Sequence, residues 1–202
     1  MKHQEDGILF LSQADSKLAE IILTCPLPPV ESTQDVFHDL ASCIIEQQIH
    51  YRSTKKIFAR LLAKAGIARL SPENFPVFEI QALNGIKISL RKFETLNALL
   101  DFWQKEKLTW ETMRNEEVRN TLAQIPGIGS WTMDMILLYT LGRPDIVPYD
   151  DFHLKQIMAQ VYGLNPSHRL KTQMKAIAQT WEAHSSLAVR YLLAWKAYMQ
   201  TK

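Results

Sequence analysis

The sequence predicts an all-α protein with two helical lobes flanking a cleft, and three observations lead to this prediction. Apolar residues recur every three or four positions along most of the 202-residue chain, which is the spacing of an amphipathic helix. No stretch alternates apolar and polar residues as a half-buried strand does. Glycines and prolines separate the helical stretches, and the break Pro126-Gly127-Ile128-Gly129 divides them into two groups, residues 33–124 and 130–202.

Each helical stretch has its own signal. Apolar residues recur at helical spacing from Phe37 to Ile45, after Ser32 and Asp35, which can cap a helix. The stretch from Ile57 to Leu62 repeats this spacing, with lysines and arginines on its other faces. Further helices are expected at residues 90–104, 115–123, 131–141, 151–161, 169–183 and 187–199, with breaks at Ser71-Pro72, Asn84-Gly85, Gly142-Arg143-Pro144 and Asn165-Pro166.

Prolines also mark a boundary near the N-terminus. Residues 24–29 contain three prolines, which is typical of a linker. We therefore expect an N-terminal helix and linker, residues 1–30, that pack on a core of residues 31–202.

Composition limits the location and the cofactors. The first six residues carry charges of both signs, and the apolar run Ile8–Leu11 is too short for a signal peptide or a membrane helix. This predicts a cytoplasmic protein, or a nuclear one in a eukaryote, with no membrane partner. The two cysteines, Cys25 and Cys43, are too few for a four-cysteine zinc or iron–sulfur site. We expect both to be reduced and structural, and no cofactor to be required.

The charge alternates along the chain although the formal net charge is only +2. Residues 1–49 carry a net −6, residues 50–92 +7, residues 93–154 −5 and residues 155–202 +6. Two basic segments of this kind indicate one surface that faces a polyanion. Solvated helix faces would give the same pattern.

The segment from Ile125 to Thr132 is typical of a phosphate-binding turn. Gly127 and Gly129 allow backbone conformations and close approaches that other residues resist, and a helix follows from Ser130. Successive N–H groups of such a turn and of the helix start can point at a phosphate oxygen, with the side chains of Ser130 and Thr132 nearby. Tight connections between helices also use glycine freely. The backbone carbonyls of Ala123, Ile125 and Ile128 could hold a Na⁺ or K⁺ ion.

Three motifs in order resemble one family. Ile44-Ile45-Glu46-Gln47-Gln48-Ile49-His50, the hairpin at residues 122–133, and Asp151 twenty positions after Trp131 are similar to the helix-hairpin-helix (HhH-GPD) superfamily of base-excision DNA glycosylases. The resemblance covers roughly residues 33–200 and implies the same helical fold around a helix-hairpin-helix DNA-binding motif. Only some 30 residues precede this core, which suggests a compact form without the N-terminal α/β domain of many relatives.

Trp131 indicates the branch of the family. Members that also cut the DNA backbone have a lysine there, the nucleophile of a Schiff base, and tryptophan cannot take that role. The resemblance therefore implies a monofunctional enzyme of the AlkA type, a DNA-3-methyladenine glycosylase II. A tryptophan can stack on a cationic methylated purine. Trp131 could instead be a core residue of the second hairpin helix, and Tyr149 could either line the base pocket or pack against the hairpin.

Asp151 matches the family's catalytic aspartate. Cleavage of an N-glycosidic bond develops positive charge on the deoxyribose, which an ionised carboxylate stabilises while it orients or deprotonates water. Aspartate at a helix start is also a common capping residue. We expect Asp150 to take the cap and leave Asp151 free.

The segment Gln47-Gln48-Ile49-His50 lies where the family inserts a wedge into the minor groove as the nucleotide is extruded. Gln48 matches the intercalating position, and His50 replaces the usual serine. Polar caps between two helices would look the same. Toward the C-terminus, Trp181-Glu182-Ala183-His184-Ser185 replaces the usual Trp-x-Pro-x-Arg, so the role of that arginine does not transfer.

The function expected from these residues is hydrolysis of the N-glycosidic bond of alkylated purines, such as 3-methyladenine and 7-methylguanine, in double-stranded DNA. Base flipping precedes the reaction, and an abasic site is left in an uncut strand. The protein is expected to act as a monomer. Two alternatives are a non-catalytic DNA-binding module that uses only the hairpin, and a glycosylase with lyase activity for oxidised or mismatched bases.

Overall fold

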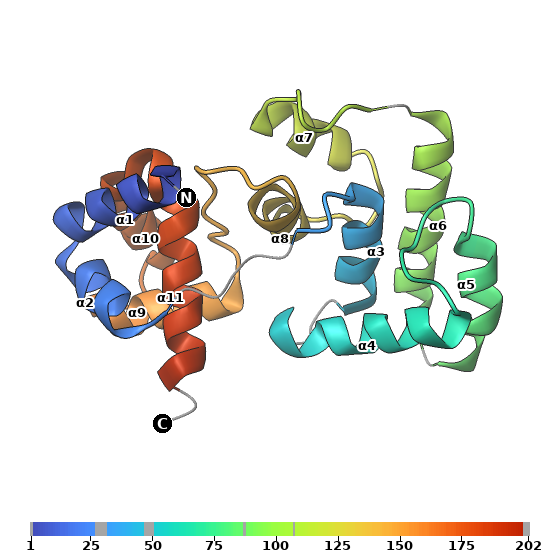
Figure 1. Cartoon of the computed structure of the whole chain (residues 1–202), viewed down its shortest axis with the longest axis horizontal. Helices are drawn as coiled ribbons and strands as arrows, with labels where there is room; N and C mark the ends of the chain where they lie inside the picture. The colour runs from blue at the N-terminus through green and yellow to red at the C-terminus, as the bar shows by residue number, and fades with distance from the viewer. Residues whose placement is uncertain (1, 27–31, 47–50, 87, 107, 200–202) are drawn as a thin grey trace. The chain divides into compact units, whose positions relative to one another are not determined.

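The computed structural model describes residues 2–26, 32–46, 51–86, 88–106 and 108–199, and these form helices, turns and loops without a β-strand (Figure 1). The prediction of an all-α protein is confirmed. The chain divides into two compact units: unit one consists of Met1–Glu31 and Leu137–Lys202, and unit two of Ser32–Ile136. No described helix is long and apolar enough to cross a membrane.

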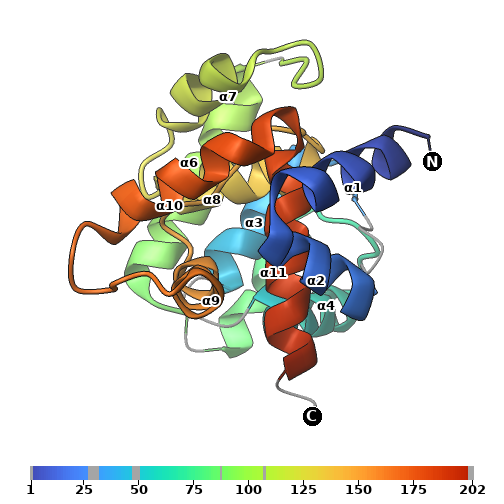
Figure 2. The same ribbon diagram turned by 90° about the vertical axis from the view of Figure 1, so that its left-hand side faces the viewer.

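Unit one joins the two ends of the chain. Its helices are α1 (Lys2–Ala14), α2 (Ser16–Thr24), α9 (Phe152–Tyr162), α10 (Leu170–Ala178), the short η3 (Gln179–His184) and α11 (Ser185–Met199). Helix α11 packs against α1, α2, α9 and η3, and Figure 2 shows α1 and α2 beside it. The core of this unit is therefore built around the C-terminal helix.

A buried carboxylate connects the N-terminal helices to the rest of unit one. Asp15 Oδ1 caps α2 by accepting from the amides of Lys17 and Leu18 at 3.0 and 3.1 Å. Its Oδ2 accepts from the Tyr162 hydroxyl at 2.7 Å and from Trp181 Nε1 at 2.9 Å. One side chain thus starts a helix and holds two residues that lie 147 and 166 positions further along the chain.

Unit two contains α3 (Val36–Glu46), α4 (Tyr51–Ala65), α5 (Phe75–Gln81), η1 (Leu83–Gly85), α6 (Leu90–Lys105), α7 (Asn115–Leu122) and α8 (Ser130–Met135). Helix α3 packs on α4 and α6, with α4 also against α5. The residues that fill this core are almost fully buried: Phe37, Leu40, Ile44, Phe58, Phe78, Leu96 and Leu99. Burial of such side chains from amphipathic helices supplies most of the stability of a helical unit.

The structure differs from the sequence prediction in five places. The N-terminal segment forms two helices, and helix α5, which starts with Pro76 in its first turn, was not expected. The turn at residues 126–129 lies inside unit two, so the units divide between residues 136 and 137 and not at the turn. The stretch expected as one helix at 131–141 is α8 followed by a π-helical segment, Ile136–Thr140. The stretch at 169–183 changes to η3 at Gln179 and kinks at Glu182 (φ 46°, ψ −129°).

Candidate functional site

The predicted phosphate-binding turn connects α7 to α8 in unit two. Gly127 has φ +90°, a left-handed conformation that favours glycine. A Cβ added at Gly127 would lie 2.1 Å from Thr95 Oγ1 of α6, so the turn also approaches that helix closely. Both facts require glycine at this position.

Gly129 has a different environment. Its backbone is extended (φ −100°, ψ 173°), and a Cβ added there would meet nothing within 4 Å. Gly129 and Ser130 are exposed at the start of α8, whereas Thr132 is only 2% exposed. The backbone of the turn is therefore open to a ligand, but the structure does not support a phosphate contact by the buried Thr132 side chain.

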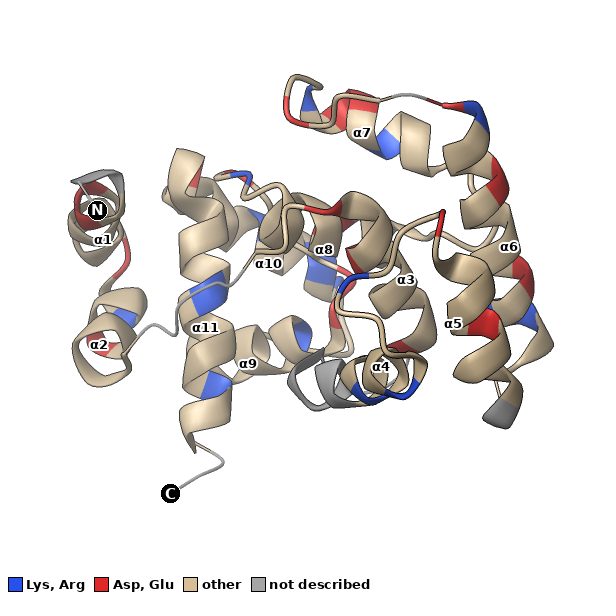
Figure 3. Ribbon diagram, turned by 45° about the vertical axis from the view of Figure 1, so that its right-hand side comes forward, with Lys and Arg blue, Asp and Glu red and all other residues tan. Residues whose placement is uncertain are grey.

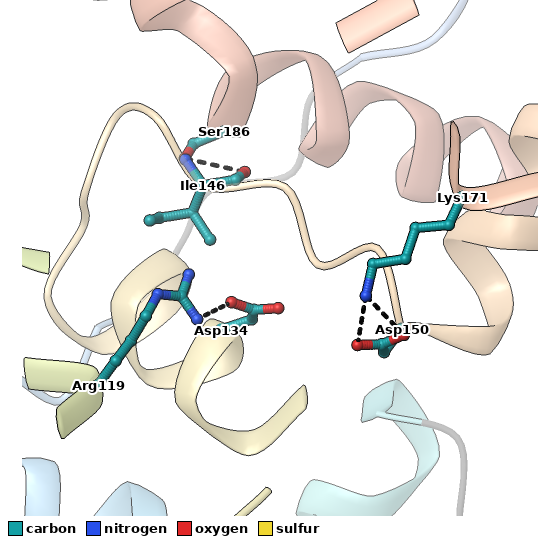
Figure 4. Close-up of polar contacts among 6 residues, drawn as sticks. All are labelled: Arg119, Asp134, Ile146, Asp150, Lys171 and Ser186. Carbon is teal, nitrogen blue, oxygen red and sulfur yellow. Dashed lines mark hydrogen bonds and ion pairs between the residues drawn. The ribbon is translucent and has the colours of Figure 1, made fainter. Parts of the chain in front are cut away.

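An ion pair joins the two helices of the hairpin, α7 and α8. Arg119 on α7 places Nη1 2.5 Å from Oδ1 of Asp134 on α8 (Figure 4). The Asp134 side chain is 8% exposed and that of Arg119 is 35% exposed. An interaction of this kind fixes the angle at which the chain enters and leaves the turn. Trp131 lies half-buried in the first turn of the same helix α8.

The proposed cation ligands belong to this turn. The Ile125 carbonyl accepts a hydrogen bond from the Ile128 amide at 3.1 Å, which leaves it one further lone pair for an ion. No group of three or more His, Cys, Asp or Glu among the described residues could hold a metal. Cys25 and Cys43 are both buried and are not joined in a disulfide.

Asp151 in unit one is the N-cap of α9, and this corrects the expectation that Asp150 takes the cap. Its Oδ1 accepts from the Leu154 amide at 2.7 Å, and its backbone is extended (φ −65°, ψ 126°) as an N-cap requires. The side chain is buried, at 6% exposure. The carboxylate is thus held by the helix start, whose positive end stabilises a negative charge.

Asp150 makes a different set of contacts. Lys171 Nζ on α10 donates to both of its carboxylate oxygens, at 3.2 and 3.0 Å (Figure 4). Lys155 Nζ lies 3.8 Å from Oδ1. Asp150 therefore faces lysines at the surface while its neighbour in the sequence is buried at the helix start.

Ser186 anchors the loop that leads to these aspartates. Its hydroxyl donates to the Arg143 carbonyl at 2.6 Å and accepts from the Ile146 amide at 2.9 Å, and its own amide donates to the Pro144 carbonyl at 2.9 Å (Figure 4 draws the contact with Ile146). In the first turn of α11, Ser185 donates its hydroxyl to the Glu182 carbonyl at 2.8 Å. Residues 181–185 depart from the family pattern, and the residue that follows them, Ser186, holds the loop before Asp151 in place.

Lysines of unit one contact the residues on either side of Asp151. Lys175 Nζ lies 5.7 Å from the centre of the half-buried Tyr149 ring. Lys196 Nζ of α11 lies 2.6 Å from His153 Nδ1 and donates to Gln156 Oε1 at 2.5 Å. Burial lowers the pKa of Lys196 from its ordinary value, and the nearby Asp151 carboxylate opposes part of this shift.

The predicted wedge residues Gln47, Gln48 and His50 lie outside the described residues. The helix that precedes them is well fixed, because Lys92 Nζ of α6 donates to the Ile45 carbonyl at 2.7 Å in the last turn of α3. Glu46 is buried, and its Oε1 accepts from the Phe58 amide of α4 at 3.1 Å. Burial lowers the pKa of Lys92, and the charge of Glu46 opposes that shift.

Several of these residues could not be identified from the sequence. Lys171, Lys196 and Ser186 contact residues 21, 43 and 40 positions away, and no local pattern marks such pairs. The basic character of residues 155–202 was the only signal for the two lysines.

Comparison with known proteins places this geometry in a family. A model of the HhH-GPD superfamily base excision DNA repair proteins matches residues 41–183. The chain is similar to DNA-3-methyladenine glycosylase 1 of Schizosaccharomyces pombe, with 27% identity over 144 residues that make up 68% of this chain and 60% of that protein. It is also similar to the alkylbase DNA glycosidase-like protein mag2 of the same organism, with 24% identity over 90% of this chain and 89% of that protein.

A solved structure shares the fold. The 3-methyladenine DNA glycosylase of S. pombe in complex with abasic DNA has a TM-score of 0.79 and 23% identity, covering 96% of this chain and 97% of that chain. The matched family model extends over more than two thirds of the sequence and includes the hairpin, Trp131 and Asp151. The chain therefore belongs to the HhH-GPD superfamily of base excision DNA repair proteins.

Proposed function

We propose that this protein is a monofunctional DNA glycosylase that hydrolyses the N-glycosidic bond of alkylated purines, such as 3-methyladenine and 7-methylguanine, in duplex DNA. The observation that carries the proposal is the buried Asp151 carboxylate, held at the start of α9 in a chain whose hairpin helix carries Trp131 and not a lysine. The names of its relatives, a DNA-3-methyladenine glycosylase and an alkylbase DNA glycosidase-like protein, agree with this substrate class.

In this proposal the hairpin binds the phosphate backbone of the DNA. The open backbone at Gly129 and Ser130 can approach a phosphate, and the amides at the start of α8 can donate to its oxygens. Such contacts hold the duplex in register without reading its sequence. A Na⁺ or K⁺ ion on the carbonyls of the turn would add a positive charge beside that phosphate.

Trp131 supplies selectivity for the damaged base. Methylation at N3 or N7 leaves the purine ring positively charged, and an indole face attracts a cation through its π-electrons. The same charge makes the base a good leaving group, so the reaction needs little help from a general acid. Trp131 cannot form a Schiff base, which is why the proposal ends at an abasic site in an uncut strand.

Asp151 supplies the catalytic charge. As the bond to the base breaks, positive charge develops at C1′ of the sugar, and a carboxylate beside it lowers the energy of the transition state. One carboxylate oxygen accepts from the Leu154 amide, which fixes the orientation of the group. The carboxylate can also orient or deprotonate the attacking water.

The test is the release of 3-methyladenine and 7-methylguanine from methylated duplex by wild-type protein and by Asp151→Asn. Asparagine is as good an N-cap as aspartate, so the helix start is kept while the charge is lost. We expect the rate of release to fall at least about 100-fold, the size of the loss when one electrostatic contact to a transition state is removed, with little change in melting temperature. Asp145→Asn, an exposed aspartate earlier in the same loop, is the matched control.

Equal release by wild type and Asp151→Asn would show that Asp151 is only a cap, and no release by wild type would exclude the substrate class. If Asp151 serves only as the cap of α9, one other function follows, a DNA-binding module without catalysis. It predicts salt-dependent duplex binding with neither base release nor a preference for abasic DNA. Borohydride trapping on abasic DNA distinguishes a lyase, which forms a covalent adduct, from the monofunctional glycosylase and from the non-catalytic module. We expect no covalent adduct.

A further inference from the structure

Lysines from three helices of unit one surround the segment 149–153, which carries Asp151. They are Lys155 on α9, Lys171 and Lys175 on α10, and Lys196 on α11, here called the lysine cluster; Figure 3 colours lysines and arginines blue on these helices. The segment itself contains only two carboxylates, Asp150 and Asp151. The lysines therefore outnumber the carboxylates by two to one.

Asp150 holds two members of the cluster at the surface. Its carboxylate lies 3.0 Å from Lys171 Nζ and 3.8 Å from Lys155 Nζ. The side chains are 38% exposed for Asp150, 50% for Lys171 and 36% for Lys155. Ion pairs with this exposure contribute little to stability. Lys155 and Lys171 can therefore exchange Asp150 for another anionic partner without a change in the core.

The neighbouring pairs keep the segment in place. Lys175 lies over the Tyr149 ring at 5.7 Å, and Lys196 lies over the Phe152 ring at 5.6 Å while it contacts His153. Because of these contacts, Asp150 can release Lys155 and Lys171 while the segment keeps its position.

A DNA substrate brings phosphates to this segment. The reacting sugar carries one phosphate on each side, so a sugar next to Asp151 places a strongly negative backbone near residues 149–153. The two carboxylates repel that backbone and the lysine cluster attracts it.

We propose that Asp150 occupies, in the DNA-free protein, the place beside Lys155 and Lys171 that a DNA phosphate takes when a nucleotide is bound at Asp151. The inference rests on the proposed glycosylase function, because that function is what brings a phosphate to Asp151. Asp150 then competes with the DNA backbone. It weakens binding to undamaged duplex and speeds the release of the abasic product.

Asp150→Asn tests the competition, because it removes the charge and keeps the shape. Binding is measured by fluorescence anisotropy on undamaged duplex and on duplex with a tetrahydrofuran abasic analogue, between about 50 and 200 mM salt. We expect about tenfold tighter binding of undamaged duplex at the low-salt end. The slope of log K against log salt should become more negative by about one, since wild-type Asp150 takes up a cation when a phosphate displaces it. Release of the abasic product should slow.

The double variant Lys155→Met/Lys171→Met should have a slope less negative than that of wild type by about one and less negative than that of Asp150→Asn by about two, because two phosphate contacts are lost and no phosphate displaces Asp150. Adding Asp150→Asn to the double variant should leave its slope unchanged. Glu20→Gln is the matched control, because it makes the same charge change at an exposed residue of α2 in the same unit. Asp150→Ser serves as a second neutral variant, and melting temperatures confirm that each protein is folded.

The inference is overturned if Asp150→Asn binds no more tightly than wild type, if Glu20→Gln tightens binding equally, or if the gain persists without the two lysines. If wild type excises alkylated bases but Asp150→Asn leaves binding unchanged, only this inference fails. If wild type neither binds duplex nor releases a base, the proposed function fails first.

Discussion

Arg119 on α7 and Asp134 on α8 form an ion pair of 2.5 Å that joins the two helices of the hairpin. The Asp134 carboxylate is nearly buried, so its charge is costly to leave without a cation. The ion pair therefore holds together the two helices that precede and follow the turn. The stability of unit two and the geometry of the proposed phosphate-binding turn therefore depend on the same pair.

Loss of that pair should destabilise the protein. We expect Arg119→Met to lower the free energy of unfolding by about 2 kcal/mol, because the buried Asp134 carboxylate loses the guanidinium with which it forms an ion pair. Urea unfolding measures the change. Arg114→Met, at the N-cap of the same helix, is the control, since the ion pair of Arg114 with Glu117 is exposed and its loss should have a much smaller effect. Equal effects of the two variants would contradict the prediction.

The two hairpin glycines should respond differently to alanine. Gly127→Ala places a Cβ against Thr95 and forces a left-handed alanine, so it should cost at least about 2 kcal/mol of stability. Gly129→Ala meets nothing within 4 Å and should leave the melting temperature near that of wild type. It should nevertheless weaken duplex binding, because the methyl group stands where a phosphate would approach. Normal duplex binding by Gly129→Ala would remove that role.

Tyr162 should make stability fall at high pH. Burial, followed by the hydrogen bond to Asp15, raises the pKa of the Tyr162 hydroxyl above the ordinary value of 10.0. Above that value the unfolded state loses its proton while the folded state keeps it, so the free energy of unfolding decreases as pH rises, by up to about 1.4 kcal/mol per pH unit. Urea unfolding at pH 8 and at about pH 10.5 should show a larger decrease for wild type than for Tyr162→Phe. Parallel decreases would assign the effect to other groups.

Glu182 should be improved by glycine. Its backbone angles, φ 46° and ψ −129°, lie where glycine is favoured and a side chain is strained. We expect Glu182→Gly to raise the free energy of unfolding by about 1 kcal/mol, and Glu182→Gln, which keeps the strain, to leave it unchanged. Thermal unfolding by calorimetry compares the two, and a lower melting temperature for the glycine variant would refute the prediction.

Helix positions followed from the sequence because amphipathic spacing is a local property. Helix α6 was predicted at 90–104 and is found at Leu90–Lys105, and α7 was predicted at 115–123 and is found at Asn115–Leu122. Helix α5 was missed since it is only seven residues long and carries a proline, which is a break signal inside a helix but is tolerated in the first turn.

The surroundings of Asp151 could be predicted only in part. The pair Asp150-Asp151 indicated that an aspartate would cap the following helix, α9. Which of the two does so depends on the backbone angles at residue 151. The partners of the segment, Lys171, Lys196 and Ser186, come from helices that follow it, and their contacts depend on how unit one packs. The sequence identifies residue types that suit the chemistry, whereas the packing selects their partners.

The division of the chain has a consequence for synthesis on the ribosome. Unit two is one continuous stretch, Ser32–Ile136, whereas unit one needs both Met1–Glu31 and Leu137–Lys202. Domains fold as units while the chain is being synthesised, and the N-terminal residues leave the ribosome first. Unit two therefore has all of its residues available once Ile136 has been made, while α1 and α2 must wait for α11, which follows unit two in the chain. The Asp15 carboxylate can meet Trp181 only after all of unit two has been made, so the unit that holds Asp151 is completed after the unit that holds the hairpin.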